Sequence, residues 1–410
     1  MASRRNIVII GGSYGGISIA HYTMKHTINA LPDKESYQVV LISASSQVMS
    51  RPACPRALIS DDMFPQDKLF ADIRSQFSQY PDGSFRFIQA AAEAVDHEAR
   101  SVTYTVEAGT REELSFHALV VATGASSTSP LMGFNPNEAS LKESWKKFRN
   151  ALSSAKSIVV AGGGPTSIET AAELGDYLNG TSSSPQTAKV PITIISGTSQ
   201  ILPSLRPSLA KSAEQYLSKL GVRVLTSTRV MTVSPENAGR TITDLTSPST
   251  LTLSNNETIT TDLYIPAIGT TPNTSFLSPA LLTPSSQIET NTATLRVSKA
   301  GPLIYAIGDC SSYARPAVHN ILSAVPVLGN NLKRELLLAA GKSEGDVPQE
   351  KVFKEDKRES QLVPLGRSKG VGAMMGWRIP SFFVWLIKGR DYWLWTTGGL
   401  WSGKQWAKEA

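Results

Sequence analysis

The chain has 410 residues, of which 41% are hydrophobic and 18% are charged. This length accommodates two or three domains, and the apolar fraction excludes an intrinsically disordered chain. Two cysteines, Cys54 and Cys310, exclude a disulfide-stapled scaffold and a zinc domain, so we expect no metal site. The net charge of +6 is concentrated in residues 361–410. This segment contains seven basic and two acidic residues and six of the seven tryptophans.

The first predicted unit is a strand over residues 6–10, a glycine-rich turn over 11–16, a helix from residue 17 and a second strand over 37–42. A helix N-terminus offers unpaired N–H groups to a pyrophosphate, and glycine lets the backbone approach it. The G-x-G-x-x-G positions hold Gly11, Ser13 and Gly16, so serine replaces one glycine. Ser43 stands where an acidic residue usually bonds the ribose, which predicts a weaker anchor.

The same pattern returns 151 residues later, with a strand over 157–161, a turn over 162–167, a helix over 168–178 and a strand over 191–195. Here the fingerprint positions hold Gly162, Gly164 and Ser167, and Ser196 replaces the acid. One imperfect copy also suits tight helix–strand packing without a ligand, but two copies favour two nucleotide sites. Without the acid, NADH and NADPH both remain open, and Arg206 is either a phosphate ligand or a surface residue.

Three further buried strands are predicted along the chain, over residues 118–122, 263–268 and 303–307. They end in Thr123–Gly124, Gly269 and Gly308–Asp309, where a ligand could approach. Residues 341–360 are charged and turn-rich, and we expect them to connect to the C-terminal segment.

Five motifs, in order, carry a family resemblance: residues 11–16, 122–124, 162–169, 265–269 and 305–310. They resemble the pyridine nucleotide–disulfide reductase superfamily, in particular its apoptosis-inducing-factor-like branch and the ferroptosis-suppressor-type NAD(P)H:quinone flavoproteins. The resemblance implies an α/β fold with two Rossmann-like domains and a small C-terminal α+β domain. The FAD domain would be discontinuous, over 1–128 and 263–340, with the NAD(P) domain inserted at 129–262 and the aromatic, basic domain at 341–410.

The turns and the resemblance together assign the cofactor sites. For FAD they indicate Gly11, Gly12, Ser13, Gly15, Gly16, Ser43, Arg56, Thr123, Gly124, Gly308 and Asp309. For NADH or NADPH they indicate Gly162, Gly164, Pro165, Thr166, Glu169, Ser196 and Gly269. The resemblance places Arg56 near the flavin, Asp309 on the ribitol chain, and Glu169 beside the nicotinamide. Glu169 also fits an ordinary amphipathic helix.

A thiol relay needs a redox-active cysteine pair, and the sequence has no C-x-x-C motif. We therefore expect hydride transfer from NAD(P)H to the flavin and then electron transfer to a quinone-like acceptor, with no side-chain nucleophile. Glu169 and His319 are weak catalytic candidates, and His319 suits an ordinary helix position as well. Two alternatives stay open: an oxidase or dehydrogenase tailoring a small-molecule metabolite, and a redox-sensing flavoprotein with a protein or nucleic-acid partner.

The aromatic tail suggests a place for the acceptor. Its rings are Trp377, Phe382, Phe383, Trp385, Tyr392, Trp393, Trp395, Trp401 and Trp406. Rings interleaved with bases suit peripheral contact with a membrane, whereas the alternative is packing on the flavin domain or on a second subunit. The absence of an RNA-binding motif argues against nucleic acid. The bases before residue 6 leave no room for a signal peptide, so we expect an intracellular, cytoplasmic protein that is not secreted, as a monomer or homodimer.

Overall fold

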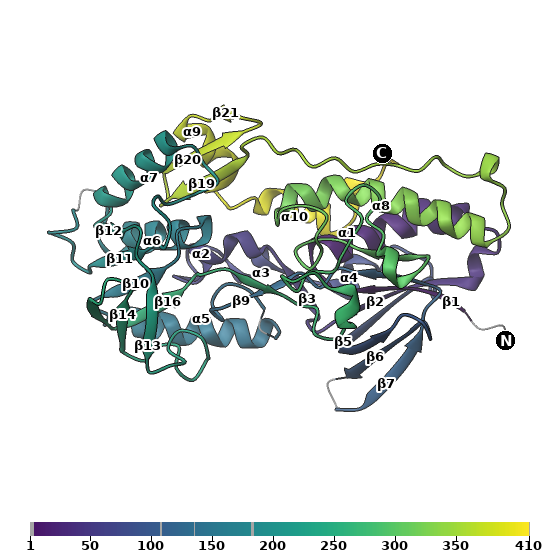
Figure 1. The fold of residues 1–410 in the computed structure, drawn as a ribbon, viewed down its shortest axis with the longest axis horizontal. Coiled ribbons are helices and arrows are strands. Elements are labelled where there is room, and N and C mark those ends of the chain that lie inside the picture. Colours follow the sequence, from purple (N-terminus) through teal and green to yellow (C-terminus); the bar gives the residue numbers. More distant parts are fainter. Residues whose placement is uncertain (1–3, 107–108, 135, 182–183, 410) are drawn as a thin grey trace.

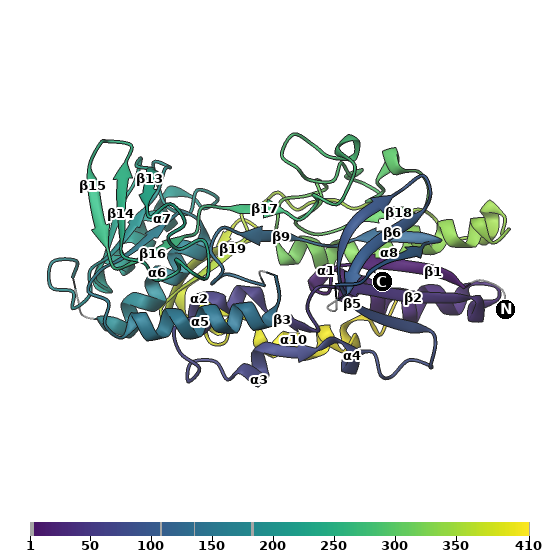
Figure 2. The same cartoon turned by 90° about the horizontal axis from the view of Figure 1, so that it is seen from below.

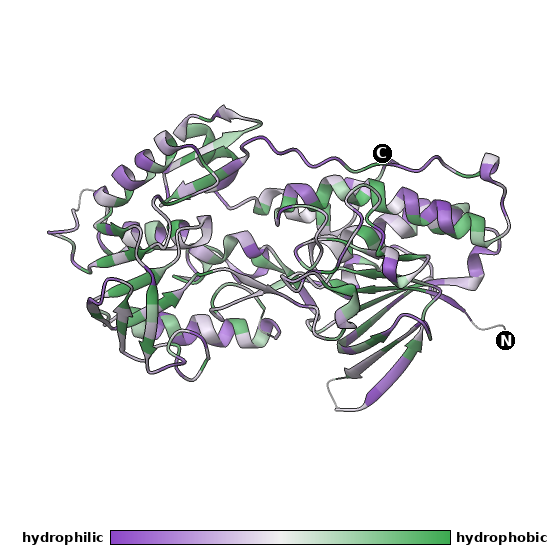
Figure 3. Ribbon diagram, in the orientation of Figure 1, coloured by the Kyte–Doolittle hydropathy of each residue, from purple (hydrophilic) through white to green (hydrophobic). Residues whose placement is uncertain are grey.

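The computed structural model describes residues 4–106, 109–134, 136–181 and 184–409. Two α/β units lie next to each other along the long axis, and the C-terminal segment, coloured yellow, reaches both of them (Figures 1 and 2). Apolar residues gather on the strands of the sheets and on the helices beside them (Figure 3). Within the described ranges, no helix is long and apolar enough to cross a bilayer.

The first unit is built on a seven-stranded sheet. Its strands, in spatial order, are β18 (Ile304–Ala306), β8 (Ala118–Val121), β1 (Arg5–Ile10), β2 (Tyr37–Ser43), β5 (Phe85–Asp96), β6 (Ser101–Val106) and β7 (Arg111–Ser115). The first five are parallel and the last two pair antiparallel. Alternate residues of β1 point to opposite faces: Ile7 and Ile9 pack with α1 (Tyr14–Tyr22) and α8 (Val318–Ala339).

Short elements lie between β2 and β5 along the chain. They are β3 (Gln47–Met49), β4 (Phe70–Asp72), α2 (Cys54–Ala57), α3 (Gln66–Leu69) and α4 (Ile73–Gln76). The other face of the sheet, which includes Val8 and Ile10, packs against residues from β6 and from the segment 277–300. Both faces of the central strands are therefore buried, as a parallel sheet requires.

The second unit has a parallel four-stranded sheet. Its order is β12 (Val222–Leu225), β11 (Ile192–Ile195), β10 (Ile158–Ala161) and β16 (Leu263–Pro266). One face packs against α5 (Glu138–Leu152), α6 (Pro165–Leu178) and α7 (Pro207–Lys219). The other face packs against an antiparallel sheet of β13 (Val230–Ser234), β14 (Ser249–Leu253) and β15 (Thr258–Thr261).

The pairing of β16 with β10 corrects the expected boundary between residues 262 and 263. The strand over 263–266 completes the sheet of the second unit, so it cannot open the returning part of the first. The chain crosses between the units at a two-stranded sheet, in which β17 (Thr270–Pro272) pairs with β9 (Ala125–Ser127). The boundaries therefore fall near residues 125 and 272.

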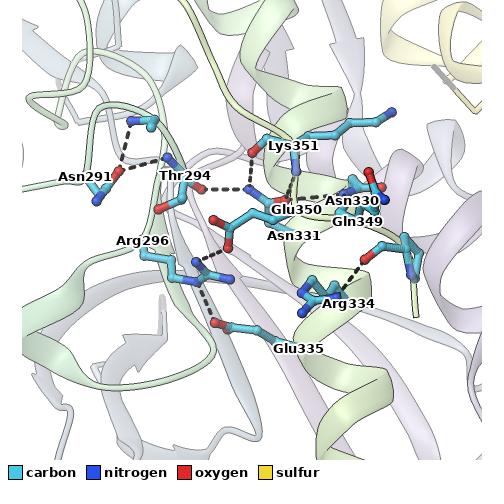
Figure 4. Close-up of polar contacts among 12 residues, drawn as sticks. Asn291, Thr294, Arg296, Asn330, Asn331, Arg334, Glu335, Gln349, Glu350 and Lys351 are labelled. Carbon is cyan, nitrogen blue, oxygen red and sulfur yellow. Dashed lines mark hydrogen bonds and ion pairs between the residues drawn. The ribbon is translucent and has the colours of Figure 1, made fainter. Parts of the chain in front are cut away.

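The segment after α8 is extended and lies on α8 itself. Asn330 and Asn331 donate to the carbonyls of Gln349 and Lys351 over 2.8 and 2.9 Å (Figure 4). Arg296 contacts the carboxylates of Glu335 and Glu350, each over 2.5 Å. The two asparagine bonds satisfy backbone carbonyls of this segment, which forms no strand there, and the Arg296 ion pairs add side-chain contacts.

The expected C-terminal domain at 341–410 is not one unit. Its compact part consists of β19 (Gln361–Leu365), β20 (Lys369–Met374), β21 (Trp377–Arg378), α9 (Ser381–Val384) and a π-helical turn (Trp385–Gly389), and it packs on α6 and α7. After it, α10 (Leu394–Trp401) returns to the first unit and packs on α1. The C-terminal segment thus bridges the two units.

Candidate flavin and nucleotide site

One cavity of about 1920 Å³ is lined by both glycine-rich turns. The turns follow β1 and β10, at the carboxyl ends of parallel strands, where α/β folds bind ligands. Residues 161–166, 169 and 195–198 of the second unit line the cavity together with residues 10–15 and 307–309 of the first. Two nucleotides bound at these turns would therefore share one space.

The first turn requires glycine for physical reasons. Gly11 has a φ of +118°, and a Cβ there would lie 2.2 Å from the carbonyl oxygen of Ala122. A Cβ on Gly12 would lie 2.6 Å from the Ser43 hydroxyl, and one on Gly16 would lie 1.7 Å from the carbonyl oxygen of Gly11. Gly16 does not line the cavity, so its role is the close packing of α1 on the turn.

The second turn repeats this geometry. Gly162 has a φ of +131°, and a Cβ there would lie 2.2 Å from the carbonyl oxygen of Ala267. Ser167, which replaces the third glycine, donates its hydroxyl to the carbonyls of Gly162 and Gly164 over 2.5 and 3.0 Å. The serine therefore closes the turn from inside and leaves the N-terminus of α6, at Pro165 and Thr166, facing the cavity.

Asp309 lines the cavity where β18 ends, after Gly308, whose φ is +88°. Within the described residues, no hydrogen bond or ion pair is made by its carboxylate. Burial raises the pKa of Asp309, and the Arg51 charge opposes that rise. A partly buried carboxylate without a partner fits a ligand that donates hydroxyl groups, as a ribitol chain does.

The other cavity residues lie where the sequence predicted. These are Ser13, Gly15, Ser43, Thr123, Gly124, Glu169, Ser196 and Gly269. Thr123 also donates to the carbonyl of Asn273 over 2.7 Å, which ties the turn to the crossing strands.

Arg56, expected near the flavin, lies outside the cavity. Its guanidinium is 6% exposed and donates two hydrogen bonds to Glu173, over 2.8 and 3.0 Å. Arg51, five residues earlier, lines the cavity instead. It donates to the carbonyls of Ala125 and Met132, which hold it beside the crossing strands.

Three acids lie one turn apart on a face of α6: Glu169, Glu173 and Asp176. Each pairs with a base that α6 does not carry. The bases are Lys388, Arg56 and Arg367, respectively. The outer two bases come from the C-terminal segment, so these pairs hold that segment on α6 across the edge of the cavity.

The Glu169–Lys388 pair is the one that lines the cavity. The Nζ–Oε1 distance is 2.5 Å, and both side chains are less than 10% exposed. Burial raises the pKa of Glu169 to about 7, and Lys388 opposes that rise. The pair explains why α6 carries a buried acid at this position, and sequence reasoning missed Lys388 because its partner is 219 residues away.

His319, the other weak catalytic candidate, is exposed on α8 and does not line the cavity, so the structure places it outside the site. Both cysteines are free and buried. Burial raises the pKa of the Cys54 thiol to about 12 and also raises that of Cys310. Since a relay needs a thiolate, neither cysteine suits disulfide exchange.

The pyridine nucleotide-disulphide oxidoreductase model matches residues 5–326, which include both turns. The chain belongs to this family. It is a flavin-dependent oxidoreductase whose cofactors are FAD and NAD(P)H. The glycine turns at Gly11 and Gly162 leave room for the pyrophosphates of these cofactors, and the Asp309 carboxylate can accept hydrogen bonds from the ribitol chain of FAD.

Three relatives place the chain within the pyridine nucleotide-disulphide oxidoreductases. Oxidoreductase phnG of Penicillium herquei is 56% identical over 99% of this chain and 98% of its own length. Ferroptosis suppressor protein 1 of Xenopus tropicalis is 25% identical over 94% and 92%. An external alternative NADH-ubiquinone oxidoreductase of Yarrowia lipolytica is 25% identical over 56% and 42%. These matches confirm the predicted branch.

Solved structures agree on the fold. NDH2 from Plasmodium falciparum in complex with NADH aligns with a TM-score of 0.63 at 17% identity, covering 96% of this chain and 94% of its own. The prediction of two Rossmann-like units is thereby confirmed.

Proposed function

We propose that this protein passes electrons from NAD(P)H through FAD to a quinone-like acceptor. The observation that carries the proposal is a single cavity with two nucleotide turns and no usable thiol. FAD supplies two-electron chemistry and NAD(P)H supplies the hydride. Without a thiol relay, the electrons must leave to a molecule that enters and departs.

An apolar planar acceptor suits part of the lining. The apolar side chains there include Met49, Pro55, Met132, Phe134 and Trp393. Quinone rings are planar and apolar, and such walls would hold them by burial and stacking. The Yarrowia relative is an NADH-ubiquinone oxidoreductase, which supports the same chemistry.

Reduction of a quinone to a hydroquinone consumes two electrons and two protons, of which the hydride carries one. Glu169 can hold the second at a carboxylate oxygen, because burial raises its pKa to about 7. Lys388 keeps that carboxyl oriented toward the cavity edge. We therefore assign proton supply to Glu169 and positioning to Lys388.

The exposed face of the compact C-terminal part, from β19 to the π-helical turn, supports peripheral contact with an anionic lipid surface. Its apolar residues are Met374, Met375, Trp377, Phe382, Phe383 and Leu386, here called the apolar patch. Trp377 is 78% exposed and Phe382 is 60% exposed, with the exposed bases Lys369 and Arg378 nearby in the chain. Rings and bases together suit a headgroup layer, from which a lipophilic quinone could be drawn.

Two other tryptophans of the tail pack on the first unit, as the alternative interpretation of the tail expected. Trp401 and Trp406 are 4% and 5% exposed. The Trp401 ring lies 4.9 Å from that of Tyr14, and His26 bonds the carbonyl of Trp406 over 2.8 Å. The proposed lipid contact is therefore limited to the apolar patch rather than to all of 377–410.

Anaerobic stopped-flow absorbance tests the function. Either NADH or NADPH should bleach the flavin, and a short-chain quinone should reoxidise it much faster than oxygen does. The variant Glu169→Gln should bleach normally but reoxidise more slowly, with the pH dependence near 7 removed. A flavin that neither nucleotide bleaches would refute the proposal, and fast reoxidation by oxygen alone would favour an oxidase.

A further inference from the structure

We infer that the second unit selects NADPH over NADH, and that Arg229 is the residue that reads the 2′-phosphate. The inference rests on the proposed function only in that the second turn binds a nicotinamide nucleotide. It starts from the end of β11, where this fold meets the adenosine ribose.

No acid stands at that end. β11 ends at Ile195, and Ser196 and Gly197 follow, where NADH-selective sites of this fold carry Asp or Glu. The Ser196 hydroxyl lies 2.8 Å from the Thr198 hydroxyl and lines the cavity. A 2′-phosphate would therefore meet hydroxyl groups there rather than a negative charge.

The Arg229 side chain covers this position. A Cβ on Gly197 would lie 2.8 Å from Cγ and 2.9 Å from Nε of Arg229, so the absence of a side chain at Gly197 makes room for it. Two backbone bonds hold the surrounding loops together: Thr228 N–H donates to the carbonyl of Ser196 over 2.9 Å, and Ser227 N–H to that of Thr198 over 2.8 Å.

The Arg229 backbone is fixed while its charge is free. Its N–H donates to the Ser254 hydroxyl over 3.0 Å, and its carbonyl accepts from Ser254 N–H over 2.8 Å. Within the described residues, its guanidinium has no hydrogen bond or ion pair, although it lines the cavity. A phosphate monoester carries roughly −1.5 to −2 charges near neutral pH, and a guanidinium fork matches it.

Other charged residues near the end of β11 do not offer a free guanidinium beside Ser196 and Gly197. Arg206, the base that the sequence suggested, bonds Glu359 and the carbonyl of Gly376 and lies outside the cavity. Arg240 and Glu236 line the cavity, but they are of opposite sign and belong to the loop after β13. Arg229 is the charge that touches the loop after β11.

Calorimetric titration of the FAD-loaded protein with NADP⁺ and NAD⁺ tests the inference without turnover. NADP⁺ should bind about 10- to 100-fold more tightly, as expected for a charge-assisted contact. Arg229→Ala should weaken NADP⁺ binding by about tenfold or more and leave NAD⁺ within about twofold, and Ser196→Asp should favour NAD⁺. Higher salt should reduce the preference.

Arg206→Ala is the matched control, since it removes the same charge outside the cavity, and it should leave both affinities unchanged. Equal affinities in the unsubstituted protein, or an unchanged ratio in Arg229→Ala, would overturn the inference. Equal flavin bleaching by NADH and NADPH would do the same while leaving the proposed function intact. Selective NADP⁺ binding without any bleaching would support the inference and refute the proposed function.

Discussion

Replacing Glu173 by glutamine should destabilise the protein by about 3–5 kcal/mol, the cost of leaving a buried charge without its partner. Glu173 is fully buried and accepts two hydrogen bonds from Arg56, at 2.8 and 3.0 Å, and one from the Tyr392 hydroxyl, at 3.0 Å. The amide keeps the shape and the tyrosine bond but removes the charge that compensates the Arg56 guanidinium.

A surface ion pair supplies the control. Lys299 pairs with Glu289 over 2.6 Å, and the two side chains are 55% and 49% exposed. Water screens that pair, so Lys299→Ala should cost only about 0–1 kcal/mol. Free energies of unfolding from urea titrations, followed by circular dichroism, measure both.

The double variant Arg56→Met/Glu173→Leu sharpens the test. Removing both charges from the buried site should recover most of the loss, because no unpaired ion remains. A cost below about 1 kcal/mol for Glu173→Gln would contradict the reasoning. So would a double variant that is less stable than Glu173→Gln.

Three more outcomes are expected. Burial lowers the pKa of His21 from 6.5 to about 4. The neutral ring therefore makes its full contribution to the free energy of unfolding above pH 6.5, and that free energy should fall by about 3 kcal/mol as the pH drops to 4. In urea titrations, His21→Gln should lose less stability over this pH range than the unsubstituted protein. Gly11→Ala, with its clash at 2.2 Å, should lose the 450 nm flavin absorbance, whereas Gly341→Ala, which meets nothing within 4 Å, should keep it; equal flavin contents would refute the steric argument. Trp377→Ser should reduce sedimentation with phosphatidylserine vesicles, whereas Trp395→Ser, outside the apolar patch but also exposed, should not; equal sedimentation of the two would argue against the patch.

The local parts of the site could be predicted from the sequence because adjacent residues encode them. A strand, a glycine turn and a helix are defined by hydrophobic period and by backbone freedom, so Gly11 and Gly162 were identifiable without a structure. The same holds for Gly308–Asp309 at the end of β18. The family follows from these turns, and the absence of a C-x-x-C motif excludes a thiol relay.

Long-range pairing determined what the sequence could not. Lys388 meets Glu169 across 219 residues, and the chain contributes strands to five sheets between them. Arg51 and Arg56 lie five residues apart, in a 3-10 turn and in α2, and only packing decides that Arg51 lines the cavity while Arg56 bonds Glu173. Strand β16 joins the second sheet because of its neighbour β10, a choice that its own apolar residues do not reveal.

The C-terminal segment shows the division most clearly. Composition showed rings and bases together at high density, and left open whether they meet a membrane or pack on the flavin domain or a second subunit. Burial then separated them: Trp401 and Trp406 pack on the first unit, while Trp377 remains in solvent. The sequence by itself determined the cofactor chemistry, because nucleotide turns are local. Only the tertiary structure decided which charges and rings face the ligand, because those contacts join residues hundreds of positions apart.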